Sequence, residues 1–293
     1  MSQARAKLTR LIKLVPQQVL PHHLLGKLMY SLTRCSAVPV KNLLIRAFIR
    51  LYGVDMKAAV YEDAAEYPDF NSFFTRELDA KARPIDPAPQ GLVSPVDGTV
   101  SQVGHIRSGH LLQAKGIQYT ALELLGNDPK AALRFSKGAF VTLYLSPRDY
   151  HRVHMPIDGY LERMTYVPGK LFSVSPYTTE NLDQLFTRNE RIISLFETPH
   201  GLMAVVMVGA LFVGGMETVW AGPVTPAQDR SLSTWSYQHI KEQVQLARGA
   251  EMGRFNMGST VILLFEKERV KWPEKLKAGM RVKMGQRIGT FVG

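Results

Sequence analysis

The N-terminal part of the chain repeats apolar side chains at helical spacing in three places. In the first place, Leu8, Leu11, Ile12 and Val15 fall at positions i, i+3, i+4 and i+7. Residues 25–32 and 44–51 show the same spacing, and prolines separate the three stretches. Apolar residues repeated at this period predict amphipathic helices, and a proline interrupts a helix interior. We therefore expect three short helices, each with one apolar face.

From about residue 66 the pattern changes to short runs of β-branched and aromatic residues between turns rich in Gly, Pro and Asp. Such runs predict strands and few helices. The apolar stretch 201–216 is too short and too rich in glycine for a bilayer span, so we expect two buried strands broken near Gly209. The clearest strand candidates are Thr99–Val103, Phe140–Leu145, Tyr160–Val167, Met203–Val208, Val261–Phe265 and Ile288–Val292.

The two patterns predict an α+β protein with two regions. Residues 1–65 form a basic, amphipathic helical region, and residues 66–293 form a β-rich, mostly antiparallel catalytic domain. A length of 293 residues with 45% apolar content suits one large domain with a smaller appendage. The single cysteine, Cys35, rules out an intramolecular disulfide and favours a reducing compartment.

The net charge of +11 is spread unevenly along the chain. Residues 1–50 carry nine Lys or Arg residues and no Asp or Glu, whereas residues 51–258 carry nineteen basic and twenty-two acidic residues. A cationic arm favours an anionic partner, either nucleic acid or a membrane surface. Lys7, Arg10 and Lys13 lie off the apolar face of the first helix, as in helices that lie in a membrane interface.

The arm lacks the interleaved aromatic residues and the reader motifs of nucleic-acid-binding proteins. We therefore expect a membrane surface as the partner and no nucleic acid. A helical subdomain that simply packs on the rest of the protein is the alternative, above all for the third helix.

The stretch 146-SPRDYHRVHMP-156 carries two histidines just after a predicted strand. Ser146, Pro147 and Asp149 stand where a helix start places its cap, its first residue and its capping-box partner. A short helix here would put His151 and His154 on one face, where two imidazoles suit acid/base work. No third ligand is spaced nearby, so we expect no metal. The alternative is two histidines held by backbone carbonyls.

Two further positions could complete a catalytic set. In 94-SPVDGTV-100, Asp97 could orient a histidine as in a Ser-His-Asp arrangement, although an ordinary Asp-Gly turn explains it equally simply. In 257-MGST-260, the hydroxyl of Ser259 could attack the carbonyl of Gly258, because glycine lets the chain reach strained angles. A histidine would have to take the hydroxyl proton. An ordinary turn before a strand is again the alternative.

Taken together, the short motifs given at the end of this paragraph resemble those of the phosphatidylserine decarboxylase family, bacterial type, from about Phe73 to the end. Their joint occurrence in this order is highly specific for that family. Met257 stands where the family usually has Leu before Gly-Ser-Thr, and the similar volume of Met leads us to expect that cleavage survives. The motifs are 73-FFTREL-78, 82-ARPID-86, 94-SPVDG-98, 115-KGIQY-119, 149-DYHRVHMP-156, 168-PGKLFSV-174, 188-RNER-191, 208-VGALFVG-214 and 252-MGRFNMGST-260.

The resemblance implies a proenzyme that cuts itself between Gly258 and Ser259 into a β chain (1–258) and an α chain (259–293). Ser259 would become a covalent pyruvoyl group, the only cofactor expected. The family's Asp-His-Ser triad for cutting matches Asp97, His154 and Ser259, and His151 matches a residue tied to decarboxylation. The activity implied is that of a carboxy-lyase, which converts phosphatidylserine to phosphatidylethanolamine and CO2 through a Schiff base on the pyruvoyl carbonyl.

The resemblance also implies where the protein works and with what. We expect it on the cytoplasmic face of the cell membrane as a peripheral protein, bound to phosphatidylserine and the anionic surface. The β and α chains would stay together as a heterodimer that dimerises further. Two alternatives stay open: a pyruvoyl decarboxylase of a soluble amino acid, and a non-catalytic membrane-binding module with a biotinyl- or lipoyl-type barrel.

Overall fold

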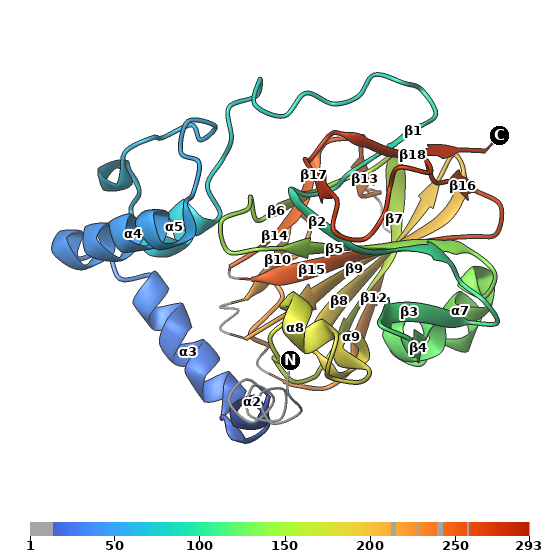
Figure 1. Ribbon diagram of the computed structural model, residues 1–293, viewed down its shortest axis with the longest axis horizontal. Coiled ribbons are helices and arrows are strands. Elements are labelled where there is room, and N and C mark those ends of the chain that lie inside the picture. The colour runs from blue at the N-terminus through green and yellow to red at the C-terminus, as the bar shows by residue number, and fades with distance from the viewer. Residues whose placement is uncertain (1–13, 212–214, 228, 239–242, 257, 293) are drawn as a thin grey trace, which may run out of the picture.

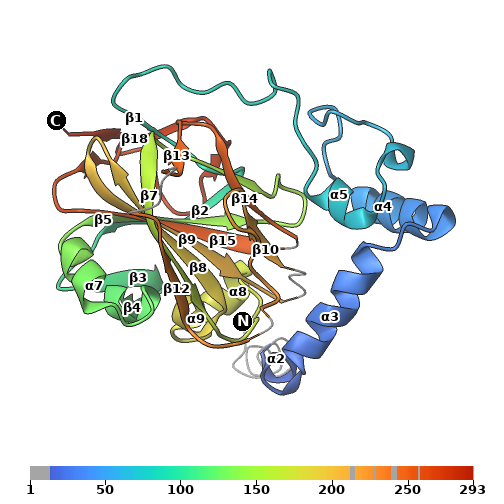
Figure 2. The same cartoon turned by 180° about the vertical axis from the view of Figure 1, so that it is seen from behind.

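The computed structural model describes residues 14–211, 215–227, 229–238, 243–256 and 258–292. It shows a β-rich body with a group of N-terminal helices at one end of it (Figure 1). Seen from behind, the same helices again stand beside the end of the sheets at which β10 and β14 lie (Figure 2). The predicted α+β class, with helices first and a mostly antiparallel β-rich domain after them, is confirmed.

The third N-terminal helix and the short helices after it pack around a small cluster of their own, whereas His22 of the second helix bonds the amide of Leu171 in the β-rich body. Ile45 is fully buried there against aromatic residues of the segment that follows, and Gly53 ends its helix in the left-handed conformation that glycine adopts readily. The cluster joins residues from both sides of position 65, so the predicted domain boundary stays a prediction. The elements are α2 (Val15–Val19), α3 (His22–Thr33), α4 (Val38–Tyr52), η1 (Ala64–Glu66) and α5 (Phe70–Phe74).

One nine-stranded antiparallel sheet forms the centre of the molecule. The strand β15 lies in its middle, between β9 and β5, and all seven of its residues are buried. In order across the sheet the strands are β12 (Ser233–Ser236), β7 (Gly159–Val167), β8 (Arg191–Thr198), β9 (Gly201–Gly209), β15 (Ser259–Phe265), β5 (Ala139–Leu145), β2 (Gly98–His105) and β17 (Arg281–Val282), and β13 (Gln245–Leu246) also pairs with β7.

Smaller sheets and short helices cover the central sheet. A four-stranded sheet holds β11 (Gly222–Pro223), β10 (Met216–Thr218), β14 (Glu251–Phe255) and β6 (Arg152–His154), and a three-stranded one holds β1 (Gly91–Val93), β18 (Arg287–Phe291) and β16 (Val270–Lys271). A hairpin joins β3 (His110–Ala114) to β4 (Ile117–Thr120). The remaining helices are α6 (Ala121–Leu124), α7 (Pro129–Phe135), α8 (Pro176–Thr179) and α9 (Leu185–Arg188).

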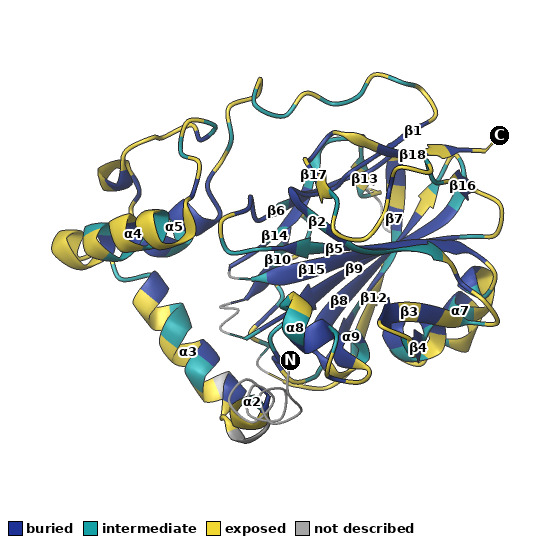
Figure 3. Cartoon of the chain, in the orientation of Figure 1, coloured by how far each residue is buried: buried dark blue, intermediate teal, exposed yellow. Residues whose placement is uncertain are grey.

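The central sheet and the N-terminal helices differ in how far their residues are buried. The central strands are buried along most of their length, whereas α3 and α4 carry exposed residues along their outer sides (Figure 3). Among these, Leu28 is 59% exposed, Leu43 70% and Leu51 76%. No helix within the described ranges is long and apolar enough to cross a membrane.

Most of the predicted elements are confirmed. All six strand candidates form strands, and α3 and α4 match the second and third predicted helices. Most of the first predicted helix lies in residues 1–13, outside the described residues. In the stretch 201–216 the first predicted strand is confirmed as β9, which ends at Gly209, and the second falls largely on residues 212–214, outside the described residues.

Candidate active site

Ser259 is the first residue of the central strand β15. It pairs with Leu145 on β5 and with Gly209 on β9, and none of its surface is exposed. Its Oγ has no hydrogen-bond partner among the described residues. A buried hydroxyl normally finds a partner, and an unpaired one in a native protein calls for an explanation such as a catalytic role. The position of Ser259 therefore favours chemistry over an ordinary turn.

Gly258 precedes this buried hydroxyl in open space. A Cβ added at Gly258 would meet no heavy atom within 4 Å. The side-chain position of Gly258 is therefore open. Met257 lies outside the described residues, so the effect of Met at this position stays a prediction.

The segment after β5 corrects the prediction of a short helix at residues 146–156. Asp149 does accept hydrogen bonds from the amide and the hydroxyl of Ser146, at 2.8 and 2.7 Å, but the result is a single turn. Residues Arg152–His154 then form β6, because their backbone groups pair with β14. The two histidines therefore do not share a helix face.

Loop 146–151 is bonded to the chain segment 255–259 on both sides of Gly258. Ser259 pairs with Leu145 at one end, and the Phe255 amide donates to the carbonyl of His151 at 3.0 Å at the other end. The two segments are thus tied together on both sides of the Gly258–Ser259 bond. This topology brings His151 to the segment that carries Ser259.

His151 is fully buried, and its ring lies 4.1 Å from the ring of Phe74. Its Nδ1 lies 2.8 Å from the Asp149 carbonyl, which can only accept, so Nδ1 carries the proton and Nε2 carries the lone pair. Nε2 has no partner among the described residues. Burial lowers the pKa of His151 to about 3. The ring is neutral at ordinary pH and has one nitrogen available to accept a proton.

His154 has both ring nitrogens engaged. Nδ1 donates to the Gly249 carbonyl at 2.8 Å, and Nε2 lies 2.9 Å from the Tyr150 hydroxyl, which donates to its lone pair. Burial lowers the pKa of His154 as well. Its side chain lines a cavity of about 340 Å³, together with Arg152 and Glu251. The lone pair of His154 is free for a proton only when the Tyr150 hydroxyl turns away.

Asp97 is held by a different partner from the one expected. The Nε of Arg83 lies 2.8 and 3.0 Å from its two carboxylate oxygens, and the amide of Met284 donates to it at 2.8 Å. The amide of His154 bonds the carbonyl of Pro95, so Asp97 and His154 lie on neighbouring segments. In the part of the chain that is described, no hydrogen bond joins Asp97 to His154, or either of them to Ser259.

Sequence reasoning missed three side chains that shape this site. Arg83 binds Asp97, Tyr150 binds His154, and Asn189 bonds the carbonyls of Phe172 and Gly209, each at 2.8 Å. Asn189 thereby fixes a loop beside the strand position next to Ser259. All three lie inside the motifs that carried the family resemblance, and that was the one signal that could have found them. No three His, Cys, Asp or Glu side chains in the described ranges are grouped as metal ligands.

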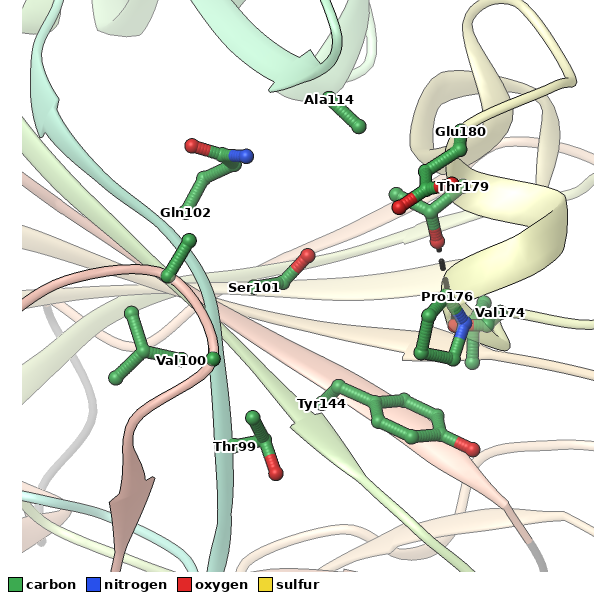
Figure 4. Close-up of a pocket in the computed structure, with 12 residues that line it drawn as sticks. Thr99, Val100, Ser101, Gln102, Ala114, Tyr144, Val174, Pro176, Thr179 and Glu180 are labelled. Carbon is green, nitrogen blue, oxygen red and sulfur yellow. Dashed lines mark hydrogen bonds between the residues drawn. The ribbon is translucent and has the colours of Figure 1, made fainter.

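A second cavity lies on the face of the central sheet opposite to the side chain of Ser259, next to the strand position that follows it. Thr260 pairs with Tyr144, and side chains alternate between the faces of a sheet, so these two residues point away from the Ser259 side. The ring of Tyr144 reaches toward Pro176 and Val174 in a cavity of about 230 Å³ (Figure 4). Burial raises the pKa of the Tyr144 hydroxyl. Ser259 is not among the residues that line this cavity.

Comparison with known proteins places this geometry in a family. Residues 70–290 match the family model described as phosphatidylserine decarboxylase, and residues 12–53 match a second model described as PSD. A protein of Azotobacter vinelandii named phosphatidylserine decarboxylase proenzyme is 52% identical over 94% of this chain and 96% of its own length.

Proteins of the same name in other bacteria agree with this match. The one from Ectopseudomonas mendocina is 50% identical over 94% of this chain and 97% of its own length. The one from Nitrosococcus oceani is 50% identical over 94% of this chain and 90% of its own length. The resemblance seen in the motifs is confirmed, and the chain belongs to the phosphatidylserine decarboxylase family.

Proposed function

We propose that this protein is a self-processing, pyruvoyl-dependent decarboxylase that converts phosphatidylserine to phosphatidylethanolamine and CO2 at a membrane surface. The observation that carries the proposal is Ser259, a fully buried serine whose hydroxyl has no partner among the described residues. It follows a glycine with free space around it and lies at the end of a strand bound to the His151 loop.

The cut begins with the Ser259 hydroxyl. A base takes its proton, Oγ attacks the Gly258 carbonyl carbon, and the peptide C–N bond breaks to leave an ester and a free Ser259 amine. Removal of the Ser259 α-proton then expels the Gly258 carboxylate and leaves dehydroalanine. Tautomerisation and hydrolysis by water release ammonia and give the pyruvoyl end of the α chain. The buried, unpaired position of Ser259 fits a group formed in place from this residue.

The two products would remain one molecule. The α chain, residues 259–293, begins with β15, which is hydrogen-bonded on both edges to β9 and β5 of the β chain. The same α chain also supplies β16, β17 and β18. Cutting at residue 258 therefore removes one peptide bond and leaves the pairing of the sheet in place, which supports a stable β/α heterodimer.

In the decarboxylation step the pyruvoyl group supplies an electron-withdrawing carbonyl that takes up the electron pair released with CO2. We assign Asp97 and His154 to the cut, and His151 to proton transfer at the substrate carbon. The single fixed tautomer of His151 and its free Nε2 support a role in moving one proton at a defined place. The apolar contact with Phe74 keeps water away from that nitrogen.

The N-terminal helices support work at a membrane. The outward-facing apolar residues of α3 and α4 include Leu24 at 58% exposure and Leu51 at 76%. Exposed apolar residues grouped on basic helices are typical of surfaces that bind lipid. We propose a peripheral position on the cytoplasmic face, where anionic phosphatidylserine would attract the basic arm.

The test is an intact mass of the purified protein under denaturing conditions, together with CO2 release from phosphatidylserine vesicles. We expect fragments 1–258 and 259–293, with the short one lighter by one ammonia than a serine-ended fragment, and lipid-dependent CO2 release. A single uncut chain that releases no CO2 would contradict the proposal. Release from a soluble amino acid in place of the lipid would favour a different decarboxylase.

A further inference from the structure

A basic cavity lies between the end of α4 and the catalytic domain. Its volume is about 390 Å³, and Gly53 from the end of α4 and Tyr150 from the histidine loop both line it. Three carboxylates, of Asp55, Asp97 and Asp149, also reach it. The basic side chains among its described lining residues are those of Arg76, Arg83, Arg148, Arg281 and Lys283.

Two of the carboxylates are already neutralised. Arg83 binds Asp97 through its Nε at 2.8 Å, and Arg281 binds Asp149 at 2.6 Å. The third, Asp55, accepts a hydrogen bond from the amide of Lys57. The cavity is therefore left with a surplus of positive charge, carried by the cations that have no carboxylate at ion-pair distance within the described residues: Arg76, Arg148 and Lys283.

Arg76 is the unusual member of this group, because only 4% of it is exposed. Its Nη2 donates to the Arg148 carbonyl at 3.3 Å, and its Nε is buried without a partner among the described residues. Burial lowers its pKa, an effect that the charge of Asp97 partly offsets, and its guanidinium lies 5.6 Å from the centre of the Phe73 ring. A buried cation without an anion at ion-pair distance is expensive to keep in a folded protein. An arginine that lines a cavity in this state is suited to a negatively charged ligand.

Arg76 lies close to the candidate active site. The Arg148 carbonyl that it binds belongs to loop 146–151, which starts beside Ser259 and ends at His151. The positive charge of Arg76 is also one of the causes that lower the pKa of His151. An anionic group held at Arg76 would therefore lie close to the loop that carries His151.

We propose that Arg76, with Arg148 and Lys283 at the mouth of the cavity, binds the phosphodiester of the phospholipid head group. This inference rests on the proposed function. The other anion of the substrate, its carboxylate, leaves as CO2, and an ion pair with arginine would stabilise the carboxylate and oppose its loss. The phosphodiester keeps its charge throughout the reaction, so a permanent guanidinium can hold it from binding to product release.

The first test measures binding of inorganic phosphate to the uncut Ser259→Ala chain by phosphorus NMR. In that background Arg76→Gln should weaken phosphate binding at least ten-fold, and Arg76→Lys should give an intermediate result because lysine lacks the planar fork. The matched control is Arg134→Gln on α7, a surface arginine paired with Glu266, which changes the charge equally and should leave binding unchanged. Equal phosphate binding by the Arg76→Gln chain and its parent would overturn the proposal.

The second test uses the chain with Ser259 intact and dihexanoyl-phosphatidylserine below its micellar concentration. Arg76→Gln should still cut itself, raise KM at least ten-fold and change kcat less, and lose competitive inhibition by inorganic phosphate. An unchanged KM for this soluble lipid, with lower activity only on vesicles, would mean that the cavity holds membrane phosphates in general. That result would overturn its assignment to the substrate.

Two further arms keep the tests decisive. Should Arg76→Gln fail to fold, phosphate binding is measured instead in the double variant Arg148→Gln and Lys283→Gln, which changes two exposed positions. Unchanged phosphate binding by this variant would again overturn the proposal. A parent chain that neither cuts nor releases CO2 would refute the proposed function. Phosphate binding by the Ser259→Ala chain would still decide separately whether the cavity is an anion site.

Discussion

The surroundings of His151 and His154 differ although only two residues separate them. His151 is fully buried against the ring of Phe74 and has one nitrogen free among the described residues. His154 borders a polar cavity with Arg152 and has both nitrogens bonded. Side chains alternate along an extended chain, so residues three apart point to opposite sides of β6. In a helix the same spacing would have put them on one face.

The difference separates the two jobs that the proposed function needs. A proton acceptor with a free lone pair, kept neutral by burial, belongs to the loop whose backbone is bonded to the segment before Ser259. A second imidazole, hydrogen-bonded to Tyr150, lines a cavity. One short stretch, the end of loop 146–151 and the strand β6 after it, therefore supplies two acid/base groups with different surroundings, and mutations can test which group serves which step.

The largest effect is expected from Ser259→Ala. Without the hydroxyl there is no nucleophile and no precursor of the pyruvoyl group, so the chain should stay whole and release no CO2. Denaturing mass spectrometry and a CO2 assay measure both outcomes. The control is Ser194→Ala on β8, another buried serine whose hydroxyl is unpaired within the described residues, which should leave cutting intact. Cutting in the Ser259→Ala chain would refute the mechanism.

The next largest effect separates the two histidines. His154→Ala should stop the cut, whereas His151→Ala should cut normally and lose decarboxylation by at least about 100-fold, the usual contribution of a positioned acid or base. The same mass and CO2 assays follow both steps. His151→Gln keeps a polar group in the pocket and serves as the control for misfolding, checked by thermal unfolding. Loss of cutting in both His151 variants would transfer the base role to His151, whose lone pair is free.

The fold followed from the sequence wherever a local pattern determines the outcome. The nearly continuous apolar runs of β5 and β15 are buried on both sides, and α3 and α4 follow their helical periodicity. The helix predicted for residues 146–156 does not form, because its capping signals compete with a tertiary contact. Pairing with β14 satisfies the backbone of Arg152–His154, and only the turn at Ser146 remains of the predicted helix.

The sequence could name candidate site residues but not the hydrogen bonds that they make. Ser259, Asp97 and both histidines could be named from motifs, yet Asp97 binds Arg83 and His154 binds Tyr150. Those pairings depend on side chains up to fourteen residues away meeting in space. The spacing of residues in the sequence does not show which donor and acceptor meet in the folded protein, so the hydrogen bonds could be read only from the structure.

A smaller effect should appear in the pH dependence of the free energy of unfolding. The folded pKa of His151, about 3, lies below its ordinary value of 6.5. Below pH 6.5 the unfolded chain binds a proton that the folded chain does not. The stability due to the neutral ring is therefore complete above that pH and declines as pH falls toward 3, by about 1.4 kcal/mol per unit.

Urea unfolding at pH 7 and pH 5 measures this effect in the uncut Ser259→Ala chain. Between pH 7 and pH 5, the free energy of unfolding should fall by about 2 kcal/mol less in the His151→Phe chain than in its parent. The other histidines titrate in both chains, so the parent chain is the control. Equal losses in the two chains would mean that His151 is protonated in the folded state, contrary to its burial.

The smallest effect is expected from Tyr150→Phe, and it bears most directly on how the two histidines differ. The change removes the hydroxyl that occupies Nε2 of His154 and leaves the bond from Nδ1 to Gly249 intact. With His154 as the base for the cut, its lone pair becomes free, and the chain should cut as fast as the parent or a few times faster. Cutting is followed by gel after synthesis in a cell-free system, and Tyr160→Phe, at a half-exposed tyrosine on β7, is the matched control. Slower cutting would show that the Tyr150 hydroxyl positions His154 for the reaction, and the two imidazoles would then differ in how they are held as well as in which side of β6 they face.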